Sequence, residues 1–242
     1  MSCEPRNIKL VIGYDGTEFS GWQRQKNSRT IQGEIERTLN RMTKEDILLN
    51  GAGRTDAGVH ADGMVAHFHT ASAISSANFL RGINAILPSS IRIFSAEDVD
   101  ASFHARFSAV GKQYQYEIYT GTIQPPRLCL HTLHITCPLD LTAIEKCLAI
   151  LIGTHDFSSF ENSGSRDKTF KSGRGAVRTI HEAKLLVLGG ELFALQFSGD
   201  GFLRNMIRNL VGTLLEVGKG KITPEAFAAI LAAKNRTMAG PT

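Results

Sequence analysis

In Thr-Ile-Gln-Gly-Glu-Ile-Glu-Arg-Thr-Leu-Asn-Arg-Met-Thr, residues 30–43, the apolar side chains recur at helical spacing. These side chains are Ile31, Ile35, Leu39 and Met42. A helix with one apolar face must bury that face against another element. Residues 8–14, further towards the N-terminus, read as a strand. The stretch therefore predicts an amphipathic helix packed on a sheet.

The segments that follow complete a βαββαβ order in the first half of the chain. Strands are expected at residues 47–52, 64–70 and 91–99, with a second helix at 77–87 that ends before Pro88. This order is that of the ferredoxin-like arrangement, in which two helices cover one face of an antiparallel sheet. The other face of the sheet is then free.

The second half nearly repeats this order, but one strand short. The expected strands are 112–119, 177–188 and 192–198. The expected helices are 203–217, 224–233 and one that starts near Thr142. Thr142 and Glu145 would form a capping box at the start of that last helix. Residues 236–242 resemble the lead-in to the missing last strand. We expect an α+β fold class with domains at 1–104 and 105–242, whose antiparallel sheets join around a central cleft.

Composition limits the class of protein. The chain has 242 residues, 42% of them apolar, and a net charge of +4, which permits a polyanionic partner without requiring one. No apolar run reaches the ~20 residues of a membrane span, and the N-terminus lacks a signal-peptide pattern. A cytoplasmic location is expected. The four cysteines form no CxxC pair. We therefore expect them to be small buried hydrophobic residues, with no disulfide and no structural zinc.

The segment Gly-Ala-Gly-Arg-Thr-Asp-Ala-Gly-Val-His-Ala, residues 51–61, is the least ordinary in the chain. Its three glycines bracket a strand end and place Arg54 and Asp56 in a tight turn. The spacing fits neither GxGxxG nor GxxxxGKS/T, so it gives little support to a nucleotide cofactor. A purely structural turn remains the alternative interpretation.

This segment resembles the signature of the tRNA pseudouridine synthase A family, whose essential aspartate falls at Asp56. Further matches occur in the family's order at residues 21–25, 103–107, 112–116, 155–160 and 202–209. Two departures stand out. Met64 replaces a usual glutamine, and residues 162–174 are longer and more polar than is typical.

The resemblance implies that the enzyme isomerises uridine to pseudouridine in the anticodon stem-loop of tRNA, at tRNA positions 38 to 40. The base would be detached, rotated and rejoined through its carbon five without any cofactor. The resemblance also implies a homodimer, and makes the expected central cleft an RNA-binding one. Asp56 would act in ionised form, as a nucleophile or as a base, and the sequence does not choose between these routes.

Arg208 is the expected catalytic partner of Asp56. Burial under a base raises the pKa of a carboxyl, whereas a nearby guanidinium lowers it. In the expected helix at 203–217, the apolar stripe leaves Arg204 and Arg208 together on another face at i, i+4 spacing. A solvated basic face is the alternative interpretation.

The resemblance assigns substrate and RNA contacts as well. Arg54 would enter the RNA and support the flipped nucleotide, Tyr114 would stack on the base, and Tyr116 would belong to the core. The expected RNA-binding residues are Arg24, Gln25, Phe103, His104, Ala105, Arg106, Phe107, Lys112, Arg174 and Arg178. Arg166, Lys168 and Lys171 would join the last two in a basic loop that grips phosphates.

Two rival functions remain open. A metal-dependent hydrolase would use the cluster of Asp56, His60, Asp62, His67 and His69, although no established ligand spacing is present. A non-catalytic RNA-binding module would need the basic loops, but it would not need a carboxylate in the turn at 54–56, where negative charge repels phosphate.

Overall fold

The computed structural model describes residues 5–162 and 174–242 and has an α+β fold. The chain divides into two compact units, residues 1–109 and 110–242, and each is described by itself below. The first unit has a four-stranded sheet and the second a five-stranded, mostly antiparallel sheet. The described residues contain five α-helices, none of them long and apolar enough to cross a membrane.

The first unit has the expected order of strands and helices. Its elements are β1 (Arg6–Tyr14), α1 (Ile31–Thr43), β2 (Asn50–Gly51), β3 (Ala61–Thr70), α2 (Ser76–Ile86) and β4 (Ile91–Val99). The strands lie in the order β2-β3-β1-β4, and all pairs are antiparallel. β2 has two residues rather than the six expected over 47–52, because only Asn50 and Gly51 pair with β3.

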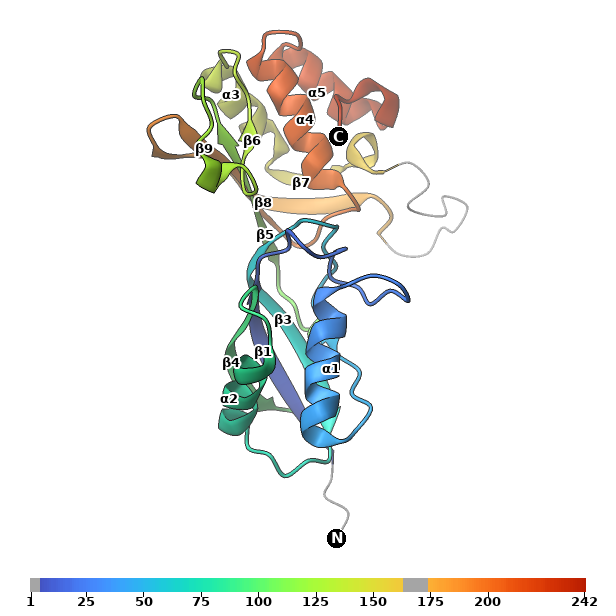
Figure 1. The fold of residues 1–242 in the computed structure, drawn as a ribbon. Helices are drawn as coiled ribbons and strands as arrows, with labels where there is room; N and C mark the ends of the chain where they lie inside the picture. Colours follow the sequence, from blue (N-terminus) through green and yellow to red (C-terminus); the bar gives the residue numbers. More distant parts are fainter. Residues whose placement is uncertain (1–4, 163–173) are drawn as a thin grey trace. The chain divides into compact units, whose positions relative to one another are not determined.

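Both helices of the first unit lie over the same sheet (Figure 1). Alternate residues of β1, namely Ile8, Leu10 and Ile12, are fully buried, as the two-residue period of a strand with one core-facing side requires. Ile35 of α1 and Phe79 of α2 complete this core. The helix predicted from residues 30–43 is confirmed and begins after the N-cap Thr30.

The second unit builds a larger sheet with helices packed on it (Figure 1). Its elements are β5 (Lys112–Tyr119), β6 (Leu133–His134), α3 (Leu141–Leu151), β7 (Gly153–Asp156), β8 (Val177–Gly189), β9 (Leu192–Gly199), α4 (Met206–Gly218) and α5 (Pro224–Ala233). The strand order is β6-β5-β9-β8-β7. β6 pairs with β5 in parallel, and the other pairs are antiparallel.

The expected strand count of the second half is wrong. The sheet has five strands instead of three, because the short strands β6 and β7 add to its two sides. Residues 236–242 themselves form no strand. Arg236–Met238 form a 3-10 turn, and the following residues dock on α4, where Arg236 and Thr242 donate hydrogen bonds to Asn209 Oδ1 at 3.1 and 2.7 Å.

Two helix starts also differ from expectation. α3 is capped by Asp140, whose carboxylate accepts the Ala143 N–H at 2.9 Å, so the expected Thr142 capping box is wrong. α4 begins at Met206, because Asn205 has a left-handed backbone with φ 59°. Arg204 therefore precedes the helix and does not share its face with Arg208. The expected helix over 224–233 is confirmed as α5 and is capped by Thr223, whose hydroxyl accepts the Ala226 N–H.

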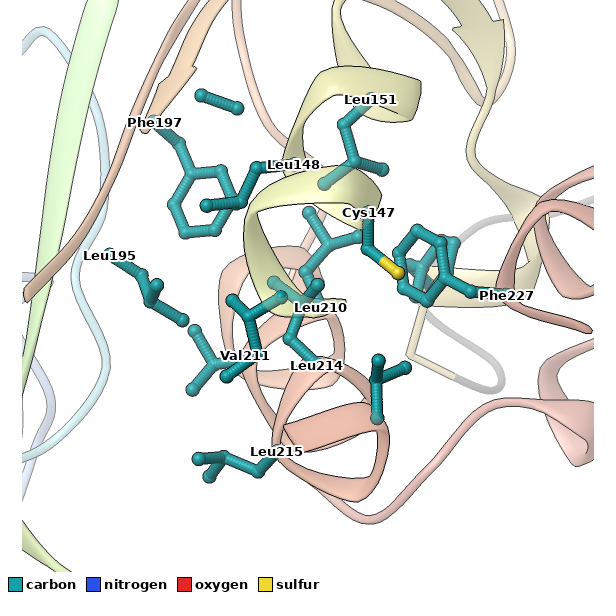
Figure 2. Close-up of a cluster of buried hydrophobic side chains, with 14 of the residues drawn as sticks. Cys147, Leu148, Leu151, Leu195, Phe197, Leu210, Val211, Leu214, Leu215 and Phe227 are labelled. Carbon is teal, nitrogen blue, oxygen red and sulfur yellow. The ribbon is translucent and has the colours of Figure 1, made fainter. Parts of the chain in front are cut away.

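The core of the second unit lies between the sheet and its helices. Figure 2 shows Leu148 of α3 and Leu210 of α4 packed towards Phe197 of β9, with the Cys147 sulfur beside Phe227. Burial raises the pKa of the Cys147 thiol to about 11. Cys129 and Cys137 are exposed, so the expectation of buried cysteines is wrong for these two, and Cys3 lies outside the described residues.

Leu214→Ala should lower the free energy of unfolding by about 2–5 kcal/mol, because a fully buried side chain of the second core is replaced by a cavity. Leu130→Ala is the matched control, since Leu130 is 65% exposed in the same unit and its loss should cost less than about 0.5 kcal/mol. Denaturant titration measures both. Equal effects of the two changes would contradict the packing described.

Candidate active site and RNA-binding surface

The turn that carries Asp56 is held through its backbone. The carbonyl oxygen of Thr55 accepts the Trp22 N–H at 3.1 Å, and the Thr55 hydroxyl lies 2.9 Å from the hydroxyl of Tyr14. Two residues after Asp56, the N–H of Gly58 donates to Phe19 at 3.3 Å. The turn is therefore fixed without any contribution from the Asp56 side chain.

The Asp56 carboxylate is exposed and, within the described part of its own unit, makes no hydrogen bond or ion pair. Arg54, two residues earlier, is also exposed and belongs to the same turn. Both side chains are thus available to a bound molecule. This placement agrees with the turn that the glycines of residues 51–61 predict.

Three glycines outside the turn let it sit close to the rest of the unit. A Cβ on Gly21, whose φ is +90°, would lie 2.5 Å from the Thr55 carbonyl oxygen, and one on Gly16 would collide with the Val59 carbonyl. A Cβ on Gly51 would lie 2.7 Å from the ring of Trp22, which is 2% exposed. Larger residues at these positions would displace the turn.

Arg208 belongs to the second unit, in the first turn of α4, and is exposed. The N-terminus of α4 has no side-chain cap among the described residues, since Asn205 makes no capping hydrogen bond. Unpaired N–H groups and the helix dipole make such an end positive, and a guanidinium adds to that charge. The site is therefore suited to an anion such as a carboxylate or a phosphate.

The two tyrosines of β5 differ in their surroundings. Tyr116 packs against the core of the second unit, as expected. Tyr114 is half-buried, and its ring meets Phe202 edge to face at 5.1 Å. Lys112 begins the same strand, opposite Gly199 of β9.

The segment of residues 103–107 folds against β1 and β3 of the first unit. The N–H of the buried Ala105 donates to His67 Nδ1 at 3.2 Å, and the Phe103 carbonyl accepts from Asn7 at 2.9 Å. His104 packs its ring 4.6 Å from that of His67. Ala105 is thus a structural anchor of this segment.

The remaining two residues of that segment point outward. Phe107 is 78% exposed, with Arg106 over its ring at 6.0 Å. An exposed aromatic ring beside a guanidinium suits a nucleic acid, because both can stack on a base and the charge attracts phosphate.

Arg24 and Gln25 lie in the loop before α1. The N–H of Arg24 donates to Gln32 Oε1 at 2.8 Å, and its guanidinium Nη1 is 3.1 Å from Glu36 Oε2. Gln25 donates to the Ser20 carbonyl at 3.1 Å.

The expected basic loop is described only at its end. Arg174 forms an ion pair of 2.6 Å with Asp200, and Arg178 donates to the Gly175 carbonyl at 2.9 Å. Arg166, Lys168 and Lys171 lie outside the described residues.

Comparison with known proteins identifies the family. The family model of tRNA pseudouridine synthases matches residues 10–108 and 148–242. The chain is 54% identical to tRNA pseudouridine synthase A 1 of Desulfotalea psychrophila over 237 residues, which cover 98% of this chain and 94% of that protein. It is 44% and 42% identical to the tRNA pseudouridine synthase A proteins of Acetivibrio thermocellus and Geobacter sulfurreducens, with the same coverage. The chain belongs to the tRNA pseudouridine synthase A family.

The rival metal site of a hydrolase finds no geometric support. Asp56, His60, Asp62, His67 and His69 do not bring three ligand atoms together among the described residues. His67 Nδ1 is also engaged by the N–H of Ala105. Membership of a pseudouridine synthase family makes the chain an isomerase.

The sequence interpretation missed the residues that support the site. Tyr14 and Trp22 hold the Asp56 turn, and Gln32 and Glu36 hold Arg24. The one available signal was that Trp22 is the chain's single tryptophan and stands beside Gly21 in a matching segment. Gln32 and Glu36 gave no such signal, because polar residues on a helix ordinarily face solvent.

Gly21→Ala should reduce pseudouridine formation at least tenfold, because the added Cβ pushes the Thr55 carbonyl and therefore Asp56 out of place. Activity on a tRNA transcript measures this loss. Gly63→Ala is the control, since nothing lies within 4 Å of a Cβ there. Full activity in Gly21→Ala would show that the close approach does not position the turn.

Acid should destabilise the first unit through His67. Burial, followed by the charges of His104 and His69, lowers the pKa of His67 below its ordinary 6.5. The unfolded chain therefore takes up a proton near pH 6.5 that the folded chain resists, so the free energy of unfolding falls as the pH drops below that value. The slope is at most about 1.4 kcal/mol per pH unit.

His67→Asn should flatten this dependence, since asparagine keeps an acceptor for the Ala105 N–H but does not titrate. Urea titrations from pH 7 to pH 5 measure the slope. His69→Asn, which leaves the burial of His67 in place, should retain it. An unchanged slope in His67→Asn would assign the acid sensitivity to other groups.

Proposed function

We propose that this chain is a tRNA pseudouridine synthase that isomerises uridine in the anticodon stem-loop, at tRNA positions 38 to 40, with Asp56 as the catalytic carboxylate. The observation that carries the proposal is an exposed carboxylate that has no partner among the described residues of its unit and lies in a hydrogen-bonded turn of a chain that belongs to this family. The net reaction is an isomerisation that consumes no co-substrate, and the proposal includes no cofactor.

The proposed architecture is two ferredoxin-like halves whose joined sheets form a central RNA-binding cleft, with the boundary a few residues after the expected 104, where the compact units 1–109 and 110–242 divide. The first sheet supports this proposal, since it has the order β2-β3-β1-β4 and helices packed on its Ile8, Leu10 and Ile12 face. The antiparallel run β5-β9-β8 of the second sheet supports it as well.

Asp56 acts in its ionised form by one of two routes. It attacks the nucleotide as a nucleophile, or it removes a proton from the ribose as a base. In both routes the bond between ribose and N1 of uracil breaks, the base rotates, a bond to C5 forms, and the proton on C5 moves to N1. Atoms and electrons balance without an external donor.

Arg208 is proposed as the electrostatic partner of this carboxylate. The supporting observation is its position in the first turn of α4, where a guanidinium adds to the positive end of the helix. A carboxylate buried beneath a base needs a compensating charge to remain ionised. A guanidinium supplies that charge with donors suited to carboxylate geometry.

Arg54 and Tyr114 are proposed to handle the flipped nucleotide. Extrusion of a base costs a few kcal/mol of stacking and pairing. Arg54, exposed beside Asp56, fills the vacated space in the RNA, and the ring of Tyr114 stacks on the uracil. Contacts to the RNA offset the remaining cost, and the proposed contacts are Arg24, Gln25, Phe103, His104, Arg106, Phe107, Lys112, Arg174 and Arg178. The buried Ala105 contributes to this surface by anchoring its segment.

A homodimer and a cytoplasmic location complete the proposal. Both rest on the family resemblance. Size measurement of the purified protein with and without tRNA tests the first.

Asp56→Asn should abolish pseudouridine formation in an unmodified tRNA transcript and leave tRNA binding intact or slightly stronger, because the change removes the reactive carboxylate and a negative charge while it keeps the shape. Asp62→Asn is the matched control, since Asp62 is an exposed aspartate of β3 and should be dispensable. Site-resolved pseudouridine mapping measures the product.

Three outcomes would contradict the proposal. Near-normal turnover by Asp56→Asn would remove Asp56 from the chemistry. Wild-type protein that binds tRNA without converting it would favour a non-catalytic module. Loss of wild-type activity in chelator, restored by a metal ion, would favour a metal-dependent enzyme.

A further inference from the structure

The loop before α1 borders a pocket of about 340 Å³ with a basic rim. Three of its lining residues carry positive charge, namely Arg24, Lys26 and Arg37. Lys26 is exposed, and the Arg24 side chain is 56% exposed. A basic pocket that is open to solvent fits the phosphate groups of a polyanion.

Beneath this pocket lies a buried carboxylate. The side chain of Glu36 is 3% exposed, and its Oε1 accepts from the Leu49 N–H and from Gln32 Nε2, both at 3.0 Å. Its Oε2 is 3.1 Å from Arg24 Nη1 and has no hydrogen-bond partner among the described residues. Glu36 therefore offers its second oxygen to Arg24.

Among the residues that the structure describes, Arg24 is the only cation paired with Glu36. The Leu49 N–H and the Gln32 amide are neutral donors, and a neutral acceptor would satisfy both. A buried carboxylate carries a desolvation cost that a neutral amide avoids. A charge in this place is therefore useful because it draws the Arg24 guanidinium to one position at the edge of the pocket.

The backbone of Arg24 is fixed by the same network. Its N–H donates to Gln32 Oε1 at 2.8 Å, while Gln32 Nε2 donates to the Leu49 carbonyl at 2.9 Å. An arginine has five N–H donors, and the contact with Glu36 is made through Nη1. The other N–H donors of the guanidinium can then bind a ligand. Because Glu36 already orients the Arg24 side chain, that side chain loses little rotamer freedom when the ligand binds.

We propose that this pocket binds a backbone phosphate of the tRNA and that Glu36 is the positioning residue that orients Arg24 in it. The inference rests on the proposed function for the identity of the polyanion. Glu36 does not touch the RNA and acts through Arg24. Its effect belongs to binding and not to the chemical step.

The test compares wild type, Arg24→Met, Glu36→Gln and the double variant on a tRNA transcript. Each single change should raise Kd and KM by about three- to tenfold at unchanged kcat, as expected for one charged contact. Each should also lower the slope of log Kd against log salt by about one. The double variant should be no weaker than Arg24→Met, because Glu36 acts through Arg24.

Glu97→Gln is the matched control, because Glu97 is also a carboxylate of the first unit paired with a cation, Lys9, and neither residue lines the pocket. It removes an equal charge and should not weaken binding. Arg24→Lys keeps the charge and leaves Glu36 unmutated but replaces the guanidinium that Glu36 orients, so it should lose part of the affinity. Melting curves establish that each variant is folded.

Several results would overturn the inference: wild-type affinity in Glu36→Gln or in Arg24→Lys, losses that multiply in the double variant, or an unchanged salt slope in Arg24→Met. Failure of the proposed function looks different. If the proposed function is wrong, wild type binds tRNA with the expected dependence on Arg24 and Glu36 but forms no pseudouridine. If only the pocket inference is wrong, wild type forms pseudouridine normally, but the effects of the Arg24 and Glu36 changes are independent of each other.

Discussion

The hydrogen bond from the Trp22 N–H to the Thr55 carbonyl is the contact on which the candidate site depends, because it fixes the Asp56 turn without using the carboxylate. Other aspartates in turns of this chain behave differently. Asp15, Asp100 and Asp156 each accept from the N–H and the hydroxyl of the residue two positions on. Those carboxylates stabilise their own turns through these hydrogen bonds.

The Asp56 carboxylate does not bond to its own turn, and there are two reasons, one in the sequence and one in the fold. The residue two positions on is Gly58, which offers no hydroxyl, and its N–H donates to Phe19. Gly21 has no Cβ, so the Thr55 carbonyl can come close enough to be bonded. A polar group left without a partner in a fixed position is a typical feature of a site that awaits a ligand.

The sequence predicted the long periodic elements well and the short or locally determined ones poorly. Strands 91–99 and 112–119 match to the residue, since their patterns run over eight or more positions. β6 and β7 were missed because strands of two and four residues are formed by their neighbours and not by their own pattern. In the candidate site, the motif at 51–61 predicted the turn that carries Arg54 and Asp56, whereas the contact between Glu36 and Arg24 depends on tertiary packing that no local pattern encodes.

The start of α4 breaks several local rules at once. Asn205 adopts a left-handed backbone, provides no side-chain cap, and is flanked by Arg204 and, one turn into the helix, by Arg208. Cations at a helix N-terminus are ordinarily disfavoured, by some tenths of a kcal/mol each. Acidic or hydroxyl residues would stabilise this end, so its composition is costly for folding and useful for holding an anion. Within the part of the second unit that the structure describes, this helix end therefore keeps its positive charge available to an anionic ligand.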